Sequence, residues 1–264
     1  MYPLSRRTLL TAAFASLATP ASAADGAPDI WELAVEGMER VTSTVWVKLL
    51  TPNLWVTSFT FDAGERFGWI PCNGLIVADS EGPIIVDTGN NREQGETLLA
   101  ITQRVTGRPA AKAIATHFHA DRTGGGEAMR AADVPVYAHP FSVGLAEAYG
   151  FPTPTPVRGL EKEPVAMGPL ELFFPGAGHT RDNITVWHAE SRTLFGGCLL
   201  RATTDNQLGS MSDADATAFP ATIARLAARY PERRIVIPGH GGAAGDAVAW
   251  TARLLAERTA PNNE

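Results

Sequence analysis

The sequence lacks several features that mark particular classes of protein. Its 264 residues include 22 lysines and arginines against 28 acidic residues, and no basic run follows the N-terminal segment. Nucleic-acid binding needs clustered positive charge, so we expect no nucleic-acid partner. No linker, repeat or low-complexity segment divides the chain, and a hydrophobic content of 45% is ordinary for a globular protein. Only two cysteines and six histidines are present, so any clustering among them is informative.

The first 23 residues have the pattern of an export signal. Two adjacent arginines precede an alanine-rich apolar run, and an Ala-Ser-Ala triplet ending at Ala23 offers a cleavage site. The segment around the arginines is similar to a twin-arginine signal; the alternative is a Sec signal that happens to contain two arginines. The apolar run is too short to span a membrane. We therefore expect cleavage near Ala23, a single mature domain of residues 24–264, a periplasmic location and no stable membrane association.

Strand-like and helix-like segments alternate along the chain, which predicts an α/β fold. The predicted strands are Leu54–Thr60, Gly74–Ala78, Pro83–Asp87, Lys112–Thr116, Val134–Ala138, Leu170–Phe174, Ile184–His188, Thr193–Gly196 and Arg234–Ile237. The predicted helices are Glu93–Thr106, Gly125–Ala132, Pro140–Tyr149, Ala216–Tyr230 and Gly245–Glu257. Pro220 should mark the first turn of its helix or kink it. The order suggests two packed α/β halves, with the proline-rich residues 151–156 as the connection between them.

The run Thr116–Arg122 contains three side chains that can bind a metal, at a spacing of two. His117, His119 and Asp121 follow an apolar, strand-like stretch. In extended backbone, residues two apart project to the same side, so these three could point into one small volume. Imidazole and carboxylate ligands suit zinc. The alternative is a chance cluster of polar residues at the end of a strand.

Three further ligand candidates lie in glycine-rich turns at predicted strand ends: His179, Cys198 and His240. Glycine allows the backbone to turn sharply or to approach a ligand closely, and strand ends facing a cleft carry the chemistry of many α/β proteins. Each candidate alone has a plain structural explanation. A lone histidine is often structural, a lone cysteine is often buried in the core, and Cys198 could form a disulfide with Cys72 in an exported protein.

Taken in order, these motifs resemble those of a class B (metallo-) β-lactamase. They read H-x-H-x-D-R, G-H-T-x-D-N, G-G-C and P-G-H-G, and the likeness extends from about Asn53 to the last helix. A thiolate ligand and an arginine after the aspartate are similar to subclass B1. The resemblance implies a four-layer αβ/βα metallo-β-lactamase sandwich of two mixed sheets with outer helices, and a site at its edge.

The resemblance also implies two zinc ions per chain. One would be held by His117, His119 and His179, and the other by Asp121, Cys198 and His240. Each ion would keep positions open for water and substrate. A zinc-bound water, deprotonated near neutral pH, would attack the lactam carbonyl, with Asp121 as a ligand that orients the nucleophile. Engagement of Cys198 by zinc would leave it unable to pair with Cys72.

The family pattern also implies how substrate is bound. Arg201 would hold the substrate carboxylate, unless it is an ordinary surface arginine. Ser210 replaces an asparagine that commonly faces the lactam carbonyl, so a water could bridge the gap. A predicted hairpin would cover the substrate with aromatic rings, unless it folds onto its own core. These rings belong to Phe61, Phe67 and Trp69.

Four residues are expected to support the ligands: Asp87, Cys72, Arg122 and Asn183. Asp87 resembles a buried aspartate that orients a ligand histidine, and Cys72 stands where relatives often have serine, near Asp121 and Arg122. A thiol is a weaker donor than a hydroxyl, and the alternative for Cys72 is a buried filler. Asn183 would support the turn after His179. His139 and His188, by contrast, match no ligand position and are interpreted as structural or exposed.

The predicted function is therefore zinc-dependent hydrolysis of β-lactam antibiotics, that is, penicillins, cephalosporins and carbapenems, by a monomeric periplasmic enzyme that confers antibiotic resistance. The enzymatic alternative is another hydrolase of the same fold, a lactonase or thioesterase. The non-enzymatic alternative is a zinc-binding or storage protein.

Overall fold

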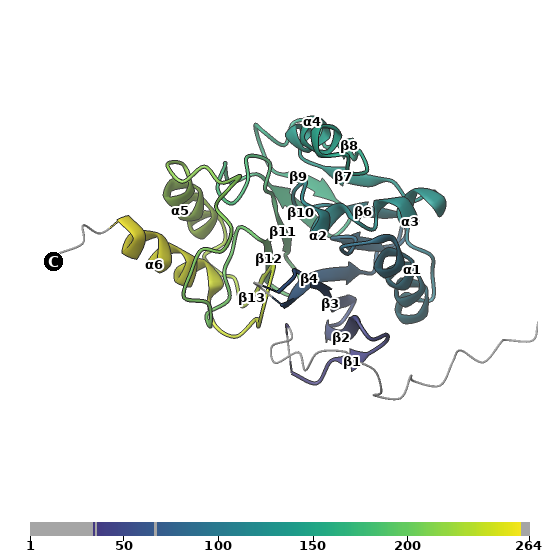
Figure 1. The fold of residues 1–264 in the computed structure, drawn as a ribbon. Coiled ribbons are helices and arrows are strands. Elements are labelled where there is room, and N and C mark those ends of the chain that lie inside the picture. Colours follow the sequence, from purple (N-terminus) through teal and green to yellow (C-terminus); the bar gives the residue numbers. More distant parts are fainter. Residues whose placement is uncertain (1–33, 35, 66–67, 260–264) are drawn as a thin grey trace, which may run out of the picture.

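The computed structural model describes residue 34, residues 36–65 and residues 68–259. Two mixed β-sheets lie in the middle of the molecule, and helices cover their outer faces (Figure 1). The predicted signal segment, its cleavage site and Phe67 fall outside the described residues.

The larger sheet has eight strands in sequence order. The strands are β1 (Glu39–Arg40), β2 (Val45–Thr51), β3 (Leu54–Asp62), β4 (Trp69–Val77), β5 (Ile84–Val86), β6 (Lys112–Ile114), β7 (Val136–Ala138) and β8 (Thr155–Pro156). The pairs from β1 to β5 are antiparallel, and those from β5 to β8 are parallel. The sheet is therefore mixed, as predicted.

The smaller sheet has five strands in the order β13-β12-β11-β10-β9. They are β9 (Val165–Met167), β10 (Leu170–Phe173), β11 (Thr185–His188), β12 (Thr193–Gly197) and β13 (Ile235–Pro238). Only the pair β12–β13 is parallel. This sheet is also mixed.

Helices on the larger-sheet side are α1 (Arg92–Thr106), α2 (Ala120–Thr123), α3 (Gly126–Ala131) and α4 (Pro140–Tyr149), and those on the smaller-sheet side are α5 (Phe219–Arg229) and α6 (Ala247–Thr259). Asn91 begins α1 by accepting a hydrogen bond from Gln94 N, and Gly107 ends it with φ 74°. Pro220 lies in the first turn of α5, as predicted. None of the described helices combines the length and apolarity needed to cross a membrane.

Three apolar layers account for the four-layer arrangement. Val86, Phe195 and Ile237 belong to the core between the two sheets. Their chain neighbours point the opposite way, because side chains alternate along a strand. Ile85 packs with Leu98 of α1, whereas Leu194 and Val236 pack in the layer that contains residues of α5 and α6. The predicted αβ/βα sandwich is thus confirmed.

The element predictions were incomplete in two ways. Strands β1, β2, β8 and β9 and the short helix α2 were not predicted, and residues 151–156, expected to connect the two halves, instead end in β8 of the larger sheet. The predicted strand Lys112–Thr116 is also too long, because β6 ends at Ile114 and residues 116–119 form bends. The extended-backbone explanation for the spacing of two is therefore wrong: His119 immediately precedes α2, and Asp121 lies in the first turn of that helix.

Candidate metal centre

The ends of strands from both sheets bring the ligand candidates together. His117 and His119 follow β6, His179 lies between β10 and β11, and Cys198 and His240 follow β12 and β13. Two glycines permit this approach. Gly197 has φ 53°, and at Gly239 a Cβ atom would lie 2.5 Å from Cys198 N. Only glycine fits where these strand ends cross so closely.

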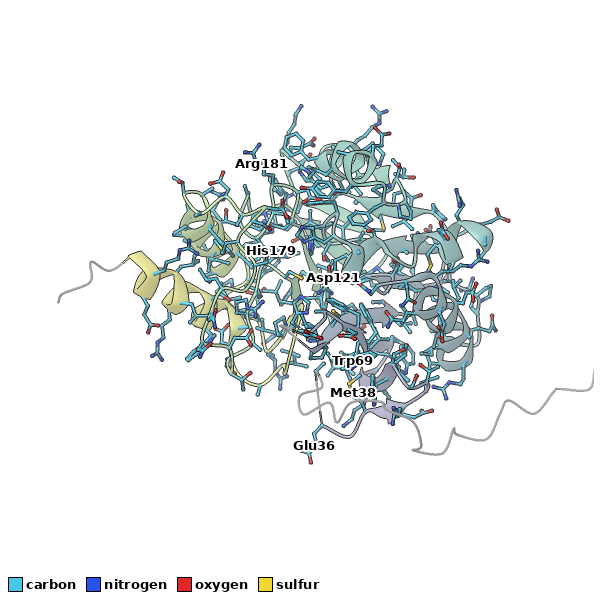
Figure 2. All side chains as sticks on the ribbon, in the orientation of Figure 1. Glu36, Met38, Trp69, Asp121, His179 and Arg181 are labelled. Atoms are coloured by element: carbon cyan, nitrogen blue, oxygen red, sulfur yellow. The ribbon has the colours of Figure 1, made fainter. Side chains whose placement is uncertain are left out.

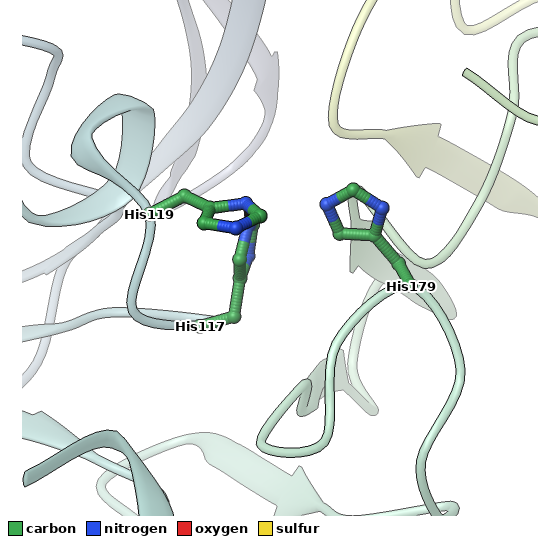
Figure 3. A group of neighbouring side chains, drawn as sticks. All are labelled: His117, His119 and His179. Atoms are coloured by element: carbon green, nitrogen blue, oxygen red, sulfur yellow. Dashed lines mark hydrogen bonds between the residues drawn. The ribbon is translucent and has the colours of Figure 1, made fainter. Parts of the chain in front are cut away.

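Three histidines surround one small volume (Figure 3). The ring centroids of His117 and His119 are 4.7 Å apart, and each lies 5.0 or 5.3 Å from that of His179. His117 Nε2 lies 3.0 Å from His119 Nδ1. Burial, with His179 and His119 nearby, holds the pKa of His117 well below its usual range. Burial likewise lowers the pKa of His179 to about 3. Both rings are therefore neutral at physiological pH, as metal ligation requires.

A second group shares a mixed set of donor atoms. Cys198 Sγ lies 3.0 Å from His240 Nε2 and 3.4 Å from Asp121 Oδ2. Asp121 Oδ2 lies 3.3 Å from His240 Nε2. His240 Nδ1 donates to Pro71 O at 3.0 Å, which leaves Nε2 as the nitrogen with a free lone pair toward the group. The structure thus brings all six predicted ligands into two adjacent groups at the junction of the halves, where Figure 2 labels Asp121 and His179.

Arg122 lies beneath the second group and is fully buried. Its Nη2 lies 2.9 Å from both Asp121 Oδ2 and Cys198 Sγ. Burial raises the pKa of Asp121, but the Arg122 guanidinium and the His240 hydrogen bond outweigh it and hold that pKa well below its usual range. Burial raises the pKa of the Cys198 thiol, and a bound cation would reverse that effect by stabilising the thiolate.

Asp87 acts on the site through the backbone and through Arg122. Its Oδ1 accepts from Thr116 N at 2.8 Å, and its Oδ2 accepts from Thr116 Oγ1 and from Arg122 Nη1. Its hydrogen bonds therefore go to the residues flanking the ligand run and not, as predicted, to a ligand histidine. Burial raises the Asp87 pKa to about 7 despite the nearby Arg122.

The remaining predicted supports lie where the sequence placed them. Cys72 is fully buried, and its Sγ lies 3.9 Å from Asp121 Oδ2 and 3.4 Å from His240 Nδ1. Both cysteines are free, so the disulfide alternative is not realised. Asn183 accepts from Thr180 N at 3.0 Å and donates to Gly176 O at 2.8 Å, which braces the turn that carries His179.

Asp213 was missed by the sequence analysis. His119 Nε2 donates to Asp213 Oδ2 at 3.0 Å, and Tyr149 Oη donates to Asp213 Oδ1 at 3.2 Å. A carboxylate on the outer nitrogen of a ligand histidine fixes both its tautomer and its ring orientation. No sequence signal pointed to this contact, because 94 residues separate the two partners.

Two predicted substrate contacts lie on the smaller-sheet side of the centre. Arg201 Nη2 forms an ion pair with Asp205 Oδ2 at 2.6 Å, and its side chain is only 16% exposed. Arg201 also lies against Gly209, where a Cβ atom would meet its Nη1 at 2.7 Å. Ser210 is exposed, and its Oγ lies 3.1 Å from Ser212 Oγ. Arg201 is therefore neither an unpaired cation nor an ordinary surface arginine.

The hairpin formed by β3 and β4 presents its aromatic rings in two directions. Phe61 pairs with Ile70, and both pack against the layer between the larger sheet and α1. Trp69 pairs with Asp62 on the opposite face and is 38% exposed. Phe61 therefore matches the alternative of a hairpin folded onto its own core, whereas Trp69 is free to cover a ligand.

The two histidines outside the predicted ligand set are structural. His139 is buried, and its Nδ1 accepts from Phe141 N at the start of α4. His188 is also buried, and its Nδ1 lies 2.7 Å from Ser191 Oγ. Both assignments agree with the sequence interpretation.

The donor atoms fit a metal ion of intermediate softness. Tetrahedral zinc with Zn–N bonds of about 2.0–2.1 Å holds two ligand nitrogens roughly 3.3 Å apart. The 3.0 Å between His117 Nε2 and His119 Nδ1 is close to that value. Nitrogen, oxygen and sulfur donors of this kind are those that zinc accepts.

Comparisons with known proteins agree with this geometry. The sequence profile of the metallo-β-lactamase superfamily matches residues 67–254. The chain is 34% identical over 184 residues to a metallo-β-lactamase type 2 from Bacteroides fragilis, covering 69% of this chain and 73% of that protein. It is 30% identical over 206 residues to one from Bacillus cereus, covering 77% and 79%.

Solved structures show the same likeness. A metallo-β-lactamase from Erythrobacter litoralis aligns with a TM-score of 0.78 and 33% identity, covering 83% of this chain and 99% of that one. FIM-1 from Pseudomonas aeruginosa, solved in a mono-zinc form, aligns with a TM-score of 0.77 and 32% identity, covering 83% and 97%. The chain therefore belongs to the metallo-β-lactamase superfamily, a family of hydrolases.

Proposed function

We propose that this protein hydrolyses the β-lactam ring of penicillins, cephalosporins and carbapenems with two zinc ions, and that it acts in the periplasm as a monomer. The observation that carries the proposal is the meeting of six donor side chains in two adjacent groups. Relatives that share at least 30% of their residues with this chain bear the name metallo-β-lactamase.

The proposed metal ligands are His117, His119 and His179 for one ion, and Asp121, Cys198 and His240 for the other. When bound, zinc would polarise the lactam carbonyl and lower the pKa of a coordinated water. The protein's own contribution is to hold neutral imidazoles and an ionised carboxylate in fixed positions. Asp213 fixes His119, Pro71 O fixes His240, and Arg122 fixes Asp121.

Charge and shape around the centre suit an anionic, cyclic amide. Arg201 would bind the substrate carboxylate, in competition with Asp205. Ser210, exposed beside Gly209, would reach the lactam carbonyl through a bridging water. Trp69 would supply apolar cover from the hairpin. Asp121 would orient the attacking water through its carboxylate.

The test is hydrolysis by purified, zinc-loaded protein of one penicillin, one cephalosporin and one carbapenem, each with and without excess chelator. We expect turnover of all three and its loss on chelation. A lactone and a thioester, assayed in parallel, distinguish a lactonase or thioesterase of the same fold. A protein that binds two zinc ions and leaves every substrate intact would instead be a binding or storage protein. Cleavage of the lactone or thioester alone would overturn the proposed substrate class.

A further inference from the structure

A small pocket beside the metal centre has no part in the substrate binding proposed above. It has a volume of about 260 Å³ and is lined by Phe118, Leu145, Arg181, Ser212, Asp213 and Ala214. These six residues define what we call the Arg181 pocket. Substrate sites for whole drug-sized molecules measure about 300–1,000 Å³, so a pocket of this size suits one substituent of a larger ligand.

The Arg181 pocket borders the proposed metal centre. The ring of Phe118 lies 4.4 Å from that of the ligand His119, and Asp213 accepts from the same histidine. Ser210 Oγ lies 3.1 Å from Ser212 Oγ, and Ser212 Oγ donates to Asp213 Oδ2 at 3.2 Å. These contacts connect the pocket to the exposed Ser210. A ligand held at the metals therefore has the pocket within reach of one side group.

Arg181 supplies the positive charge of the pocket and Asp213 a negative one, so a bound anion would lie on the Arg181 side. Asp213 uses both carboxylate oxygens, since Oδ2 accepts from His119 and Ser212 and Oδ1 accepts from Tyr149. Arg181 is exposed and, among the described residues, makes no hydrogen bond or ion pair. Figure 2 shows it labelled on the side of Asp121 and His179 away from Trp69. The pocket thus offers an apolar wall from Leu145 and Ala214 and one guanidinium that can bind an anion.

We propose that the Arg181 pocket is a specificity subsite for β-lactams whose acyl side chain carries an aryl ring and a carboxylate. The ring would lie on Leu145 and Ala214, and the carboxylate would pair with the guanidinium of Arg181. This inference rests on the proposed function. It adds a preference between substrates that the six metal ligands do not impose.

The first experiment compares benzylpenicillin with carbenicillin, which differ by one carboxylate on the acyl side chain. Arg181→Ala should raise KM for carbenicillin by about two- to fivefold, the range of a solvent-accessible ion pair, and leave KM for benzylpenicillin unchanged. Arg181→Glu should raise KM for carbenicillin further, because the new negative charge repels the carboxylate of its side chain. Arg234→Ala is the matched control. Arg234 is also an exposed arginine, but it precedes β13, whereas His240 follows that strand, so Arg234 lies at the end away from the metal centre. Equal effects of Arg181→Ala on both penicillins would overturn the subsite.

A second measurement separates the subsite from the proposed function. Phenylmalonate and phenylacetate contain the same ring with two carboxylates and one, and neither has a lactam. In an NMR titration of isotope-labelled protein, phenylmalonate should shift the amide signals of Arg181 and of residues 212–214 more than phenylacetate does, and Arg181→Ala should abolish the difference. Identical shifts by both acids would refute the subsite even if every penicillin is hydrolysed. Selective binding of phenylmalonate without turnover of any β-lactam would support the anion pocket and refute the proposed function.

Discussion

At the scale of single residues, the charge offered to substrate depends on one ion pair. Arg201 is the predicted carboxylate anchor, but its guanidinium already pairs with Asp205 at 2.6 Å, and the two side chains are only 16% and 25% exposed. A substrate carboxylate would have to compete with Asp205 or displace it. Substrate affinity would therefore depend on Asp205 as much as on Arg201.

Removing the negative charge of Asp205 should strengthen substrate binding. We expect Asp205→Asn to lower KM for a penicillin by about two- to fivefold with kcat nearly unchanged. The reason is that the Arg201 guanidinium would lose its ion pair with Asp205 and become available to the substrate carboxylate. Arg201→Ala should raise KM more than it lowers kcat. Steady-state kinetics of the two single variants and the double variant check this, since Asp205→Asn should have no effect once Arg201 is gone. A rise in KM for Asp205→Asn alone would show that the pair holds Arg201 in its binding position.

At the scale of elements, local patterns predicted most of the architecture. Alternation and helical spacing located α1, α4, α5 and α6, and buried apolar runs located β5 and β12. The glycine-rich turns also predicted the positions of ligands. A glycine such as Gly239 can be read from the sequence, and in the structure it allows a close backbone approach. These features are local, so the sequence contains them.

Contacts between distant segments were not predictable in the same way. Asp213 meets both His119 and Tyr149 only because the folded chain brings three separate segments together. The pairing of Arg201 with Asp205 depends on side-chain direction, which spacing alone does not give. The spacing of two in the ligand run was explained by the wrong element, because a histidine before a short helix and an aspartate inside it can also converge.

Helix α4 begins with a buried histidine that should make stability depend on pH. Burial lowers the pKa of His139 from its usual 6.5 to about 4. As pH falls below 6.5, the unfolded chain binds this proton before the folded protein does. Stability is therefore lost between pH 6.5 and about 4, and the loss levels off below that range.

The matched variant for this effect is His139→Asn. Asparagine can still accept from Phe141 N at the start of the helix, but it does not titrate. Between neutral pH and about pH 4.5, we expect the wild-type protein to lose about 2 kcal/mol more unfolding free energy than the variant. Urea unfolding of both proteins at the two pH values measures the difference. The comparison cancels contributions from the metal-ligand histidines, and parallel pH dependence in both proteins would contradict the assignment.

At the scale of the whole molecule, the proposed metal centre joins the two halves. His117, His119 and Asp121 follow a strand of the larger sheet, whereas His179, Cys198 and His240 lie in loops of the smaller sheet. Each proposed ion would therefore have ligands from both halves. Because a metal that binds only the folded protein stabilises it by mass action, zinc should resist separation of the halves as well as take part in chemistry.

Zinc at about one hundred times its dissociation constant should stabilise the protein by roughly 2.7 kcal/mol per site, which corresponds to a rise of about 5–10 °C in Tm for a domain of this size. Calorimetry with zinc and with excess chelator measures this shift. Cys198→Ser should lose part of the shift and part of the bound zinc, because a hydroxyl is a poorer zinc ligand than a thiolate. Cys72→Ser is the matched control: Cys72 approaches the outer nitrogen of His240 at 3.4 Å, whereas Cys198 approaches the inner one at 3.0 Å. If Cys72→Ser loses the zinc-dependent shift and Cys198→Ser keeps it, the sulfur ligand is Cys72, which forms its own donor group with Asp121 and His240.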